Sequence, residues 1–417
     1  MKRSVLLACV SLGVLAPGAF AADYSVTGRI GESVTGSDNY FLSNSPIGST
    51  FKSVTAGNLD FRARTPDTRL LLATNFSYYD YFGSGASATS PKNGFPAGAR
   101  FQADHTSELN KYNFAASWHR AEVATTQLTE SGIVTARGFL DSFAVGGGVT
   151  HDVNRTDSIG LSAHARTVRF TNSTQTPYVD VITAATWNHS FNPTTALTTT
   201  ASFDWYDAND PANSQRYFWQ IITALRTRLS ERLSFNGSIG AGFSNTRQNT
   251  NAPIGSITSF RSGTNSSVQA YVGLTYRLLK TTSLSFTAGQ SLVPTTYGAL
   301  QTISTVGLGL SHQINELSNL SFATQFAHND LNGFTSDLFS VQVGYGYRLT
   351  PALGAHLSYT YRQRNDSNGF ADASIGLVTL NYDFTLLGNP TKHDAREAEA
   401  QRARLRQRAV QAFPGLL

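Results

Sequence analysis

The stretch Asp372-Ala373-Ser374-Ile375-Gly376-Leu377-Val378-Thr379-Leu380-Asn381-Tyr382-Asp383-Phe384 decides how the rest of the chain is interpreted. From residue 377 its side chains fall into two alternating sets. One set is Val378, Leu380, Tyr382 and Phe384, and the other is Leu377, Thr379, Asn381 and Asp383. Successive side chains of a β-strand point to opposite faces of the sheet, so these residues predict a strand with one apolar and one mostly polar face. We interpret it as the closing strand of a transmembrane β-barrel.

Segments of the same kind recur from Tyr24 to Phe384. We expect about 18 of them, joined alternately by tight turns and by longer polar loops, as in single-chain outer-membrane barrels. Val268 to Leu278 and Phe339 to Leu349 are the clearest examples, with Val, Leu and Tyr on one face and Gly, Ser, Gln and Arg on the other. The predicted fold is all-β, an antiparallel up-and-down barrel. A barrel of about 16 strands is the alternative, because weak segments such as Arg100 to His105 also fit a loop.

The tight turns carry Pro, Asn, Asp and Ser, which favour sharp reversals of the chain. They include Thr65 to Thr68, Asn154 to Asp157, Asn192 to Thr195 and Thr350 to Ala352. In barrels of this class short turns lie in the periplasm, so we expect both termini there as well. The longest loop, Arg247 to Gly263, is the best candidate to fold inward and narrow the lumen.

The two ends of the chain differ from its middle. Met1 to Ala21 has a basic start, an apolar run and small residues before Ala22, which predicts a secretory signal cleaved between Ala21 and Ala22. Residues 22–388 form the predicted barrel. Residues 389–417 form a charged, helical or disordered periplasmic tail. The single cysteine, Cys9, is lost with the signal.

Composition excludes several classes of protein. The signal and the tail carry the whole formal charge of +5, so residues 22–388 are neutral and nucleic acid is not an expected partner. A chain with 11% aromatic residues, 35 glycines and only 14% charged residues suits a β-protein facing lipid. The histidines lack the spacing of metal or catalytic motifs, and we expect no enzyme activity, metal or cofactor.

Aromatic residues gather at predicted strand ends, where an interfacial belt would place them. These residues are Tyr78, Tyr79, Tyr81, Phe82, Trp205, Tyr206, Tyr359 and Tyr361. We expect them at the level of the lipid headgroups.

The alternation also selects the residues that should line a pore. By parity these are His164, Arg166, Gln220, Gln269, Tyr271, Arg277, Gln342, Arg348, Asn381 and Asp383. Arginines near the periplasmic ends of strands, namely Arg226, Arg228, Arg277 and Arg348, form a basic ring that favours anionic solutes, unless they pair with acids across strands or contact headgroups.

Several motifs resemble those of outer-membrane β-barrel porins, in particular the group found beside exopolysaccharide genes in Gram-negative bacteria. They are the signal, Ser37-Asp38-Asn39, the run Arg362 to Phe370, and the aromatic end Leu380 to Phe384. The resemblance implies a passive channel for small hydrophilic solutes, with oligosaccharides and anions as candidates. It also implies that Tyr382 and Phe384 form the signal read by the barrel-assembly machinery, here followed by a further 33 residues rather than by the chain end.

A non-conducting anchor of an envelope or polysaccharide-export assembly is the alternative function. Such an anchor would use the tail to hold a periplasmic partner. Outer-membrane lipid and lipopolysaccharide are expected partners in either case, and the chain is a candidate homo-oligomer.

Overall fold

A computed structural model of the chain describes residues 22–88, 91–130, 136–173, 175–209, 215–247, 263–294, 300–331, 334–367 and 369–388. Nearly all of these residues lie in one antiparallel sheet. Its strands are β1 (Asp23–Ser37), β2 (Thr50–Arg64), β3 (Thr68–Phe82), β4 (Asn93–Gly94), β5 (Ala97–Thr106), β6 (Asn110–Glu122), β7 (Phe139–Asp152), β8 (Asp157–Thr171), β9 (Tyr178–Asn192), β10 (Thr195–Ala208), β11 (Gln215–Arg228), β12 (Leu233–Arg247), β13 (Gly263–Leu279), β14 (Thr282–Pro294), β15 (Leu300–Gln313), β16 (Ser318–Leu331), β17 (Phe334–Arg348), β18 (Leu353–Asp366) and β19 (Gly369–Leu387). Two short helices lie between strands, η2 (Ser84–Ala88) and α1 (Val123–Glu130).

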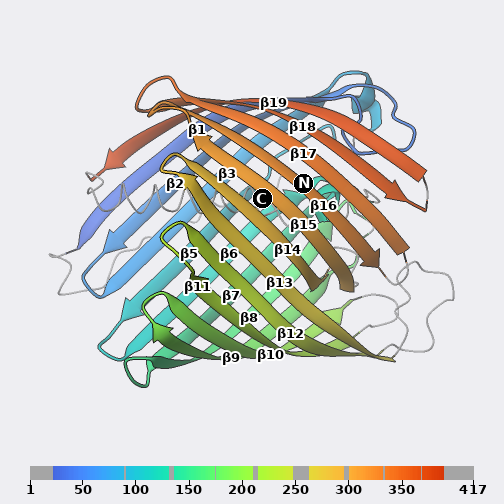
Figure 1. Cartoon of the computed structure of the whole chain (residues 1–417). Coiled ribbons are helices and arrows are strands. Elements are labelled where there is room, and N and C mark those ends of the chain that lie inside the picture. Colours follow the sequence, from blue (N-terminus) through green and yellow to red (C-terminus); the bar gives the residue numbers. More distant parts are fainter. Residues whose placement is uncertain are drawn as a thin grey trace, which may run out of the picture.

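The sheet closes on itself. Each long strand pairs with the next along the chain, and β19 pairs with β1, so the wall is a closed barrel of 18 strands (Figure 1). The two-residue strand β4 is an addition that pairs only with β3. Closure leaves no sheet edge with unsatisfied backbone groups, as a wall in lipid requires. The predicted barrel of 18 strands is confirmed, and the alternative of 16 is wrong because residues 97–106 form the regular strand β5.

The seam between β1 and β19 shows how closely the ends of the chain fit. Gly28 lies opposite Phe384, whose ring covers the space that a side chain at Gly28 would fill. One position further, Arg29 donates a hydrogen bond to the carboxylate of Asp383 at 2.5 Å. The seam therefore joins an aromatic contact on one face of the wall to an ion pair on the other.

The outer face of the barrel is apolar. Ile30, Leu161, Ile239 and Val378 are all more than half exposed and alternate with more polar neighbours. In water this much exposed apolar surface would be unfavourable, whereas in lipid it is the expected outer surface. The alternation predicted from the sequence is therefore present along the strands.

The structure corrects the predicted aromatic belt at three positions. Tyr79 and Tyr81 on β3 and Tyr206 on β10 are buried, with exposed fractions of 1%, 3% and 2%. They belong to the inward-facing set and are covered by loops, whereas Tyr78 and Phe82 on the same strand β3 are exposed on the outer face. Proximity to a strand end was an insufficient criterion, because parity and loop packing decide which face an aromatic ring occupies.

The two ends of the barrel differ. At one, the short-turn end, consecutive strands are joined by tight reversals such as that closed by Thr65 and Thr68, whose backbone groups are hydrogen bonded at 2.8 Å. At the other, the long-loop end, the first three connections are loop 1 (residues 38–49), loop 2 (83–96) and loop 3 (123–138). The loop predicted to fold inward, Arg247 to Gly263, lies outside the described residues apart from its two end residues. No helix in the described ranges is long and apolar enough to cross a membrane.

Candidate functional site

Loop 1 is fastened to the inner wall at the long-loop end. The side chain of Asn39 donates to the backbone oxygen of Asp372 at 2.8 Å, and Asp38 accepts from the backbone of Ser374 at 2.8 Å. Both partners lie on β19. These bonds carry Leu42 into the barrel, where it is 1% exposed and has a left-handed φ of 49°. A non-glycine residue tolerates that conformation only when its surroundings hold it there.

Loop 3 meets loop 1 inside the lumen. Leu128 of α1 packs in a buried cluster with Leu42 and with Ala371 and Ala373 on β19. Loop 3 leaves the wall after β6, so α1 must cross toward a distant part of the wall to reach β19. The mouth of the barrel is therefore narrowed by loops 1 and 3, a role that the sequence did not assign to either of them.

The other side of loop 3 packs against the wall on β7 to β10. Val123 and Ala136 of the loop join Val168, Tyr178 and Tyr206 in a second buried cluster. The rings of Tyr178 and Tyr206 lie 5.1 Å apart between centroids. Both ends of the loop are thus held by apolar contacts.

A buried polar network, which we call the latch, connects loop 3 to β2 and β3. Lys52 on β2 forms an ion pair with Glu122 at 3.0 Å, and both side chains are largely buried. Tyr81 donates to Glu122 at 3.0 Å, as does Thr125 of α1 at 2.7 Å. The Lys52 ammonium lies 4.4 Å from the ring centroid of Tyr79 and 4.8 Å from that of Tyr81. Because Glu122 directly precedes α1, the latch fixes where that helix begins.

A second charged group extends across four neighbouring strands of the inner wall. Arg166 on β8 donates to Asp180 on β9 at 2.8 Å. Asp204 and Arg216 follow on β10 and β11, and the guanidinium of Arg216 lies 4.7 Å from the ring centroid of Tyr206. Arg216 is only 4% exposed. Two acids on β9 and β10 thus lie between two arginines on β8 and β11, so each charge has one of opposite sign on a neighbouring strand.

The residues predicted to line the lumen alternate along each strand with the exposed apolar side chains, and their role in lining a pore remains a prediction. They are His164 and Arg166 on β8, Gln220 on β11, Gln269, Tyr271 and Arg277 on β13, Gln342 and Arg348 on β17, and Asn381 and Asp383 on β19. Four of them have direct polar partners among the described residues. Gln269 donates to Gln220 at 2.8 Å across β12, Arg166 pairs with Asp180, and Asp383 pairs with Arg29.

Sequence reasoning missed the latch, and of the four charged residues on β8 to β11 it assigned only Arg166 to the lumen. Asp180, Asp204 and Arg216 share the inward parity of Arg166, so the same alternation could have found them. Lys52 and Glu122 are 70 residues apart, and no local signal indicates that they meet. Among the described residues no group of three His, Cys, Asp or Glu is arranged to hold a metal ion.

Comparison with known proteins identifies the fold. No family model matches the chain, and no curated protein does. Among solved structures, Acinetobacter baumannii OccAB2 aligns over 87% of this chain and 98% of its own, with a TM-score of 0.51 and 10% identity. The chain has the fold of an outer-membrane porin.

Two further solved structures are similar in fold to this chain. Acinetobacter baumannii OccAB4 aligns over 88% of this chain and all of its own, with a TM-score of 0.50 and 9% identity. The copper transporter OprC aligns over 85% of this chain and 66% of its own, with a TM-score of 0.52 and 12% identity. Together with the apolar outer face, the porin fold places the chain in the outer membrane of a Gram-negative bacterium. At these identities the likeness concerns the fold alone.

Proposed function

We propose that this barrel is a channel for passive diffusion of small hydrophilic solutes, with a preference for anions. The observation that carries the proposal is that four arginines near the short-turn end have no acidic partner among the described side chains. Arg226, Arg228, Arg277 and Arg348 lie on inward-facing positions, and none forms an ion pair or hydrogen bond with a described side chain. Uncompensated guanidinium groups on a polar wall attract anions and repel cations.

Three acids on the inner wall near the same end are engaged by other bases. Asp60 pairs with Arg62 at 3.3 Å, and Asp152 pairs with Lys111 at 2.9 Å. Asp383 is held by Arg29 as described above. These three acids are therefore not partners of the four arginines, which supports the proposed preference for anions.

A reversal-potential measurement tests the proposal. The full mature chain is inserted into a planar bilayer between two salt concentrations, and the sign of the potential at zero current gives the preferred ion. We expect anion preference in the wild type and a weaker one in R226Q/R277Q/R348Q. Asn381→Gln, on another part of the inner wall, is the control and should leave the preference unchanged.

Two results would contradict the proposal. Cation preference in the wild type would show that the four arginines do not set the ion selectivity of the lumen. A folded barrel without discrete conductance steps would favour the alternative of a scaffold, which removal of residues 390–417 should then separate from its partner. Oligosaccharides are tested by adding them to the same bilayer and recording block of the current.

The orientation belongs to the same proposal. We place the short-turn end in the periplasm, as in other single-chain barrels. Cleavage between Ala21 and Ala22, a periplasmic tail at 389–417, and assembly through Tyr382 and Phe384 remain predictions. The last two side chains lie on β19, with ring centroids 6.4 Å apart.

A further inference from the structure

The outer wall carries a groove that the channel function does not use. It has a volume of about 690 Å³, in the range of sites that hold small molecules. Its lining includes Leu161 and Ala163 on β8, Ala185 on β9, Phe203 on β10 and Trp219 on β11. Leu161 is 65% exposed and Trp219 47% exposed, so the groove faces outward toward lipid.

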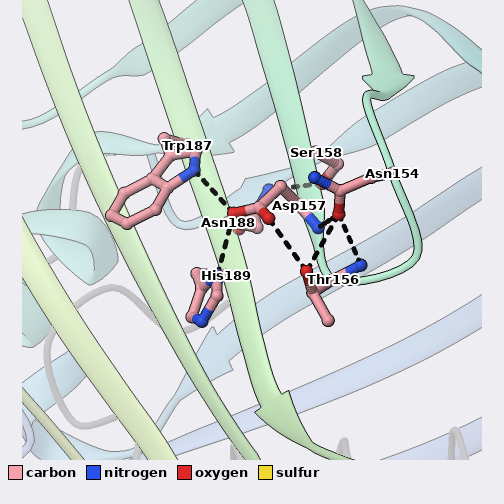
Figure 2. A network of polar contacts seen from close by, with 7 residues as sticks. All are labelled: Asn154, Thr156, Asp157, Ser158, Trp187, Asn188 and His189. Carbon is pink, nitrogen blue, oxygen red and sulfur yellow. Dashed lines mark hydrogen bonds and ion pairs between the residues drawn. The ribbon is translucent and has the colours of Figure 1, made fainter.

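A polar network lies on the same strands at the short-turn end (Figure 2). Asp157, the first residue of β8, accepts from the indole Nε1 of Trp187 at 3.2 Å and contacts Nδ1 of His189 at 2.8 Å. The His189 ring stacks on Trp187 and meets Phe191 edge-on, with centroids 5.7 and 4.6 Å apart. The carboxylate therefore fixes both rings and leaves Nε2 of His189 available for an external partner.

The turn beside this network adds a positive charge. Arg155 is exposed in the turn between β7 and β8. The backbone oxygen of the next residue, Thr156, accepts from the backbone nitrogen of Ser190 at 2.8 Å, so the turn is held against β9 next to His189. An arginine in this turn and a histidine at the adjoining end of β9 are of the residue types that bind a phosphate.

The spacing of rim and groove matches one lipid molecule. Asp157 is paired with His189, and Leu161 is paired with Ala185. Four residues along β8 separate the two pairs, which at ~3.3 Å per residue is about 13 Å. With strands tilted by roughly 40°, as in such barrels, this corresponds to about 10 Å of depth. The groove then lies within one leaflet, since half of a hydrocarbon core is roughly 15 Å. A headgroup at the rim would thus place its acyl chain over the groove.

We propose that this face holds one glycerophospholipid, with its phosphate at Arg155 and His189 and an acyl chain in the groove. Assignment to the periplasmic leaflet rests on the orientation proposed above. The lipid would bind as a discrete partner on β7 to β11, tighter than the lipid around the rest of the barrel.

Native mass spectrometry of the full mature chain in detergent tests this inference, with phosphatidylglycerol as the added lipid. Arg155→Gln removes the phosphate contact, and Ala185→Leu fills the groove. We expect each to weaken binding of the first lipid by about tenfold. Lys280→Gln in the turn before β14 and Ala288→Leu on the outer face of β14 are the matched controls, and they should bind as the wild type does.

Gel mobility with and without heating confirms that each variant is folded, and Arg155→Gln keeps the test decisive if Ala185→Leu does not fold. Equal lipid affinity in wild type, Arg155→Gln and folded Ala185→Leu would overturn the inference. Equal affinity for phosphatidylglycerol and for diacylglycerol would also overturn it, because the phosphate would then have no role. Neither readout involves ionic current, so the channel proposal stands or falls separately.

Discussion

Replacing Glu122 with Gln should release loop 3 from the wall while leaving the barrel folded. In the wild type the Lys52 ammonium is buried and its carboxylate partner lies 3.0 Å away. Removing one member of a buried ion pair leaves an uncompensated charge and costs roughly 3–5 kcal/mol. The rings of Tyr79 and Tyr81, with centroids under 5 Å from the ammonium, stabilise the charge by cation–π interactions. We therefore expect a loss of stability near the lower end of that range.

Hydrogen exchange of the α1 backbone amides measures this cost. A loss of about 3 kcal/mol in the free energy of local opening corresponds to exchange faster by more than a hundredfold. Strands on the far side of the barrel, such as β14, should keep their protection. Single-channel records should show a larger or noisier current, because α1 narrows the mouth.

A double variant supplies the control. In Lys52→Met with Glu122→Gln the stranded charge is gone and an acceptor for Tyr81 and Thr125 remains, so protection of α1 should largely return. Unchanged exchange in the Glu122→Gln variant would refute the argument that the latch holds the helix. Continued rapid exchange in the double variant would show that hydrogen bonding, rather than the buried charge, sets the stability of loop 3.

Two further predictions concern the wall itself. Gly28→Val should reduce the free energy of unfolding by about 1–3 kcal/mol, because a side chain there collides with the ring of Phe384. Urea titration should show this as a lower unfolding midpoint. An unaltered midpoint would mean that the seam can open to accept the side chain. Asp180→Asn should cost roughly 1.5–3 kcal/mol, because Arg166, whose side chain is 32% exposed, loses a charge-assisted hydrogen bond to a carboxylate that is only 5% exposed. Asp383→Asn, at a site 38% exposed, should cost under about 1 kcal/mol. Similar losses in the last two variants would argue against burial as the deciding factor.

The strands and their two faces could be predicted from the sequence, because the alternation of side chains is a local property of an extended chain. The stretch at Leu377 to Phe384 and the lumen-facing positions of Gln269 and Gln342 follow from it directly. Tight turns rich in Asn, Pro and Asp set the strand boundaries. Closure then follows, since strands with one face in lipid cannot leave a sheet edge unpaired.

Register and loop packing could not be predicted, because both depend on residues far apart in the chain. The ion pair between Arg29 and Asp383 exists only because β1 and β19 meet, 354 residues apart. Leu42 and Leu128 give no local sign that they share a cluster inside the mouth. Tyr79 lies at a strand end like any belt residue, but alternation turns it inward and the loops that pack over it bury it. The sequence by itself thus determined the strands of the wall and which face of each is apolar. The tertiary structure alone decided which loops narrow the mouth and which arginines have an acidic partner, because those outcomes depend on contacts between distant segments.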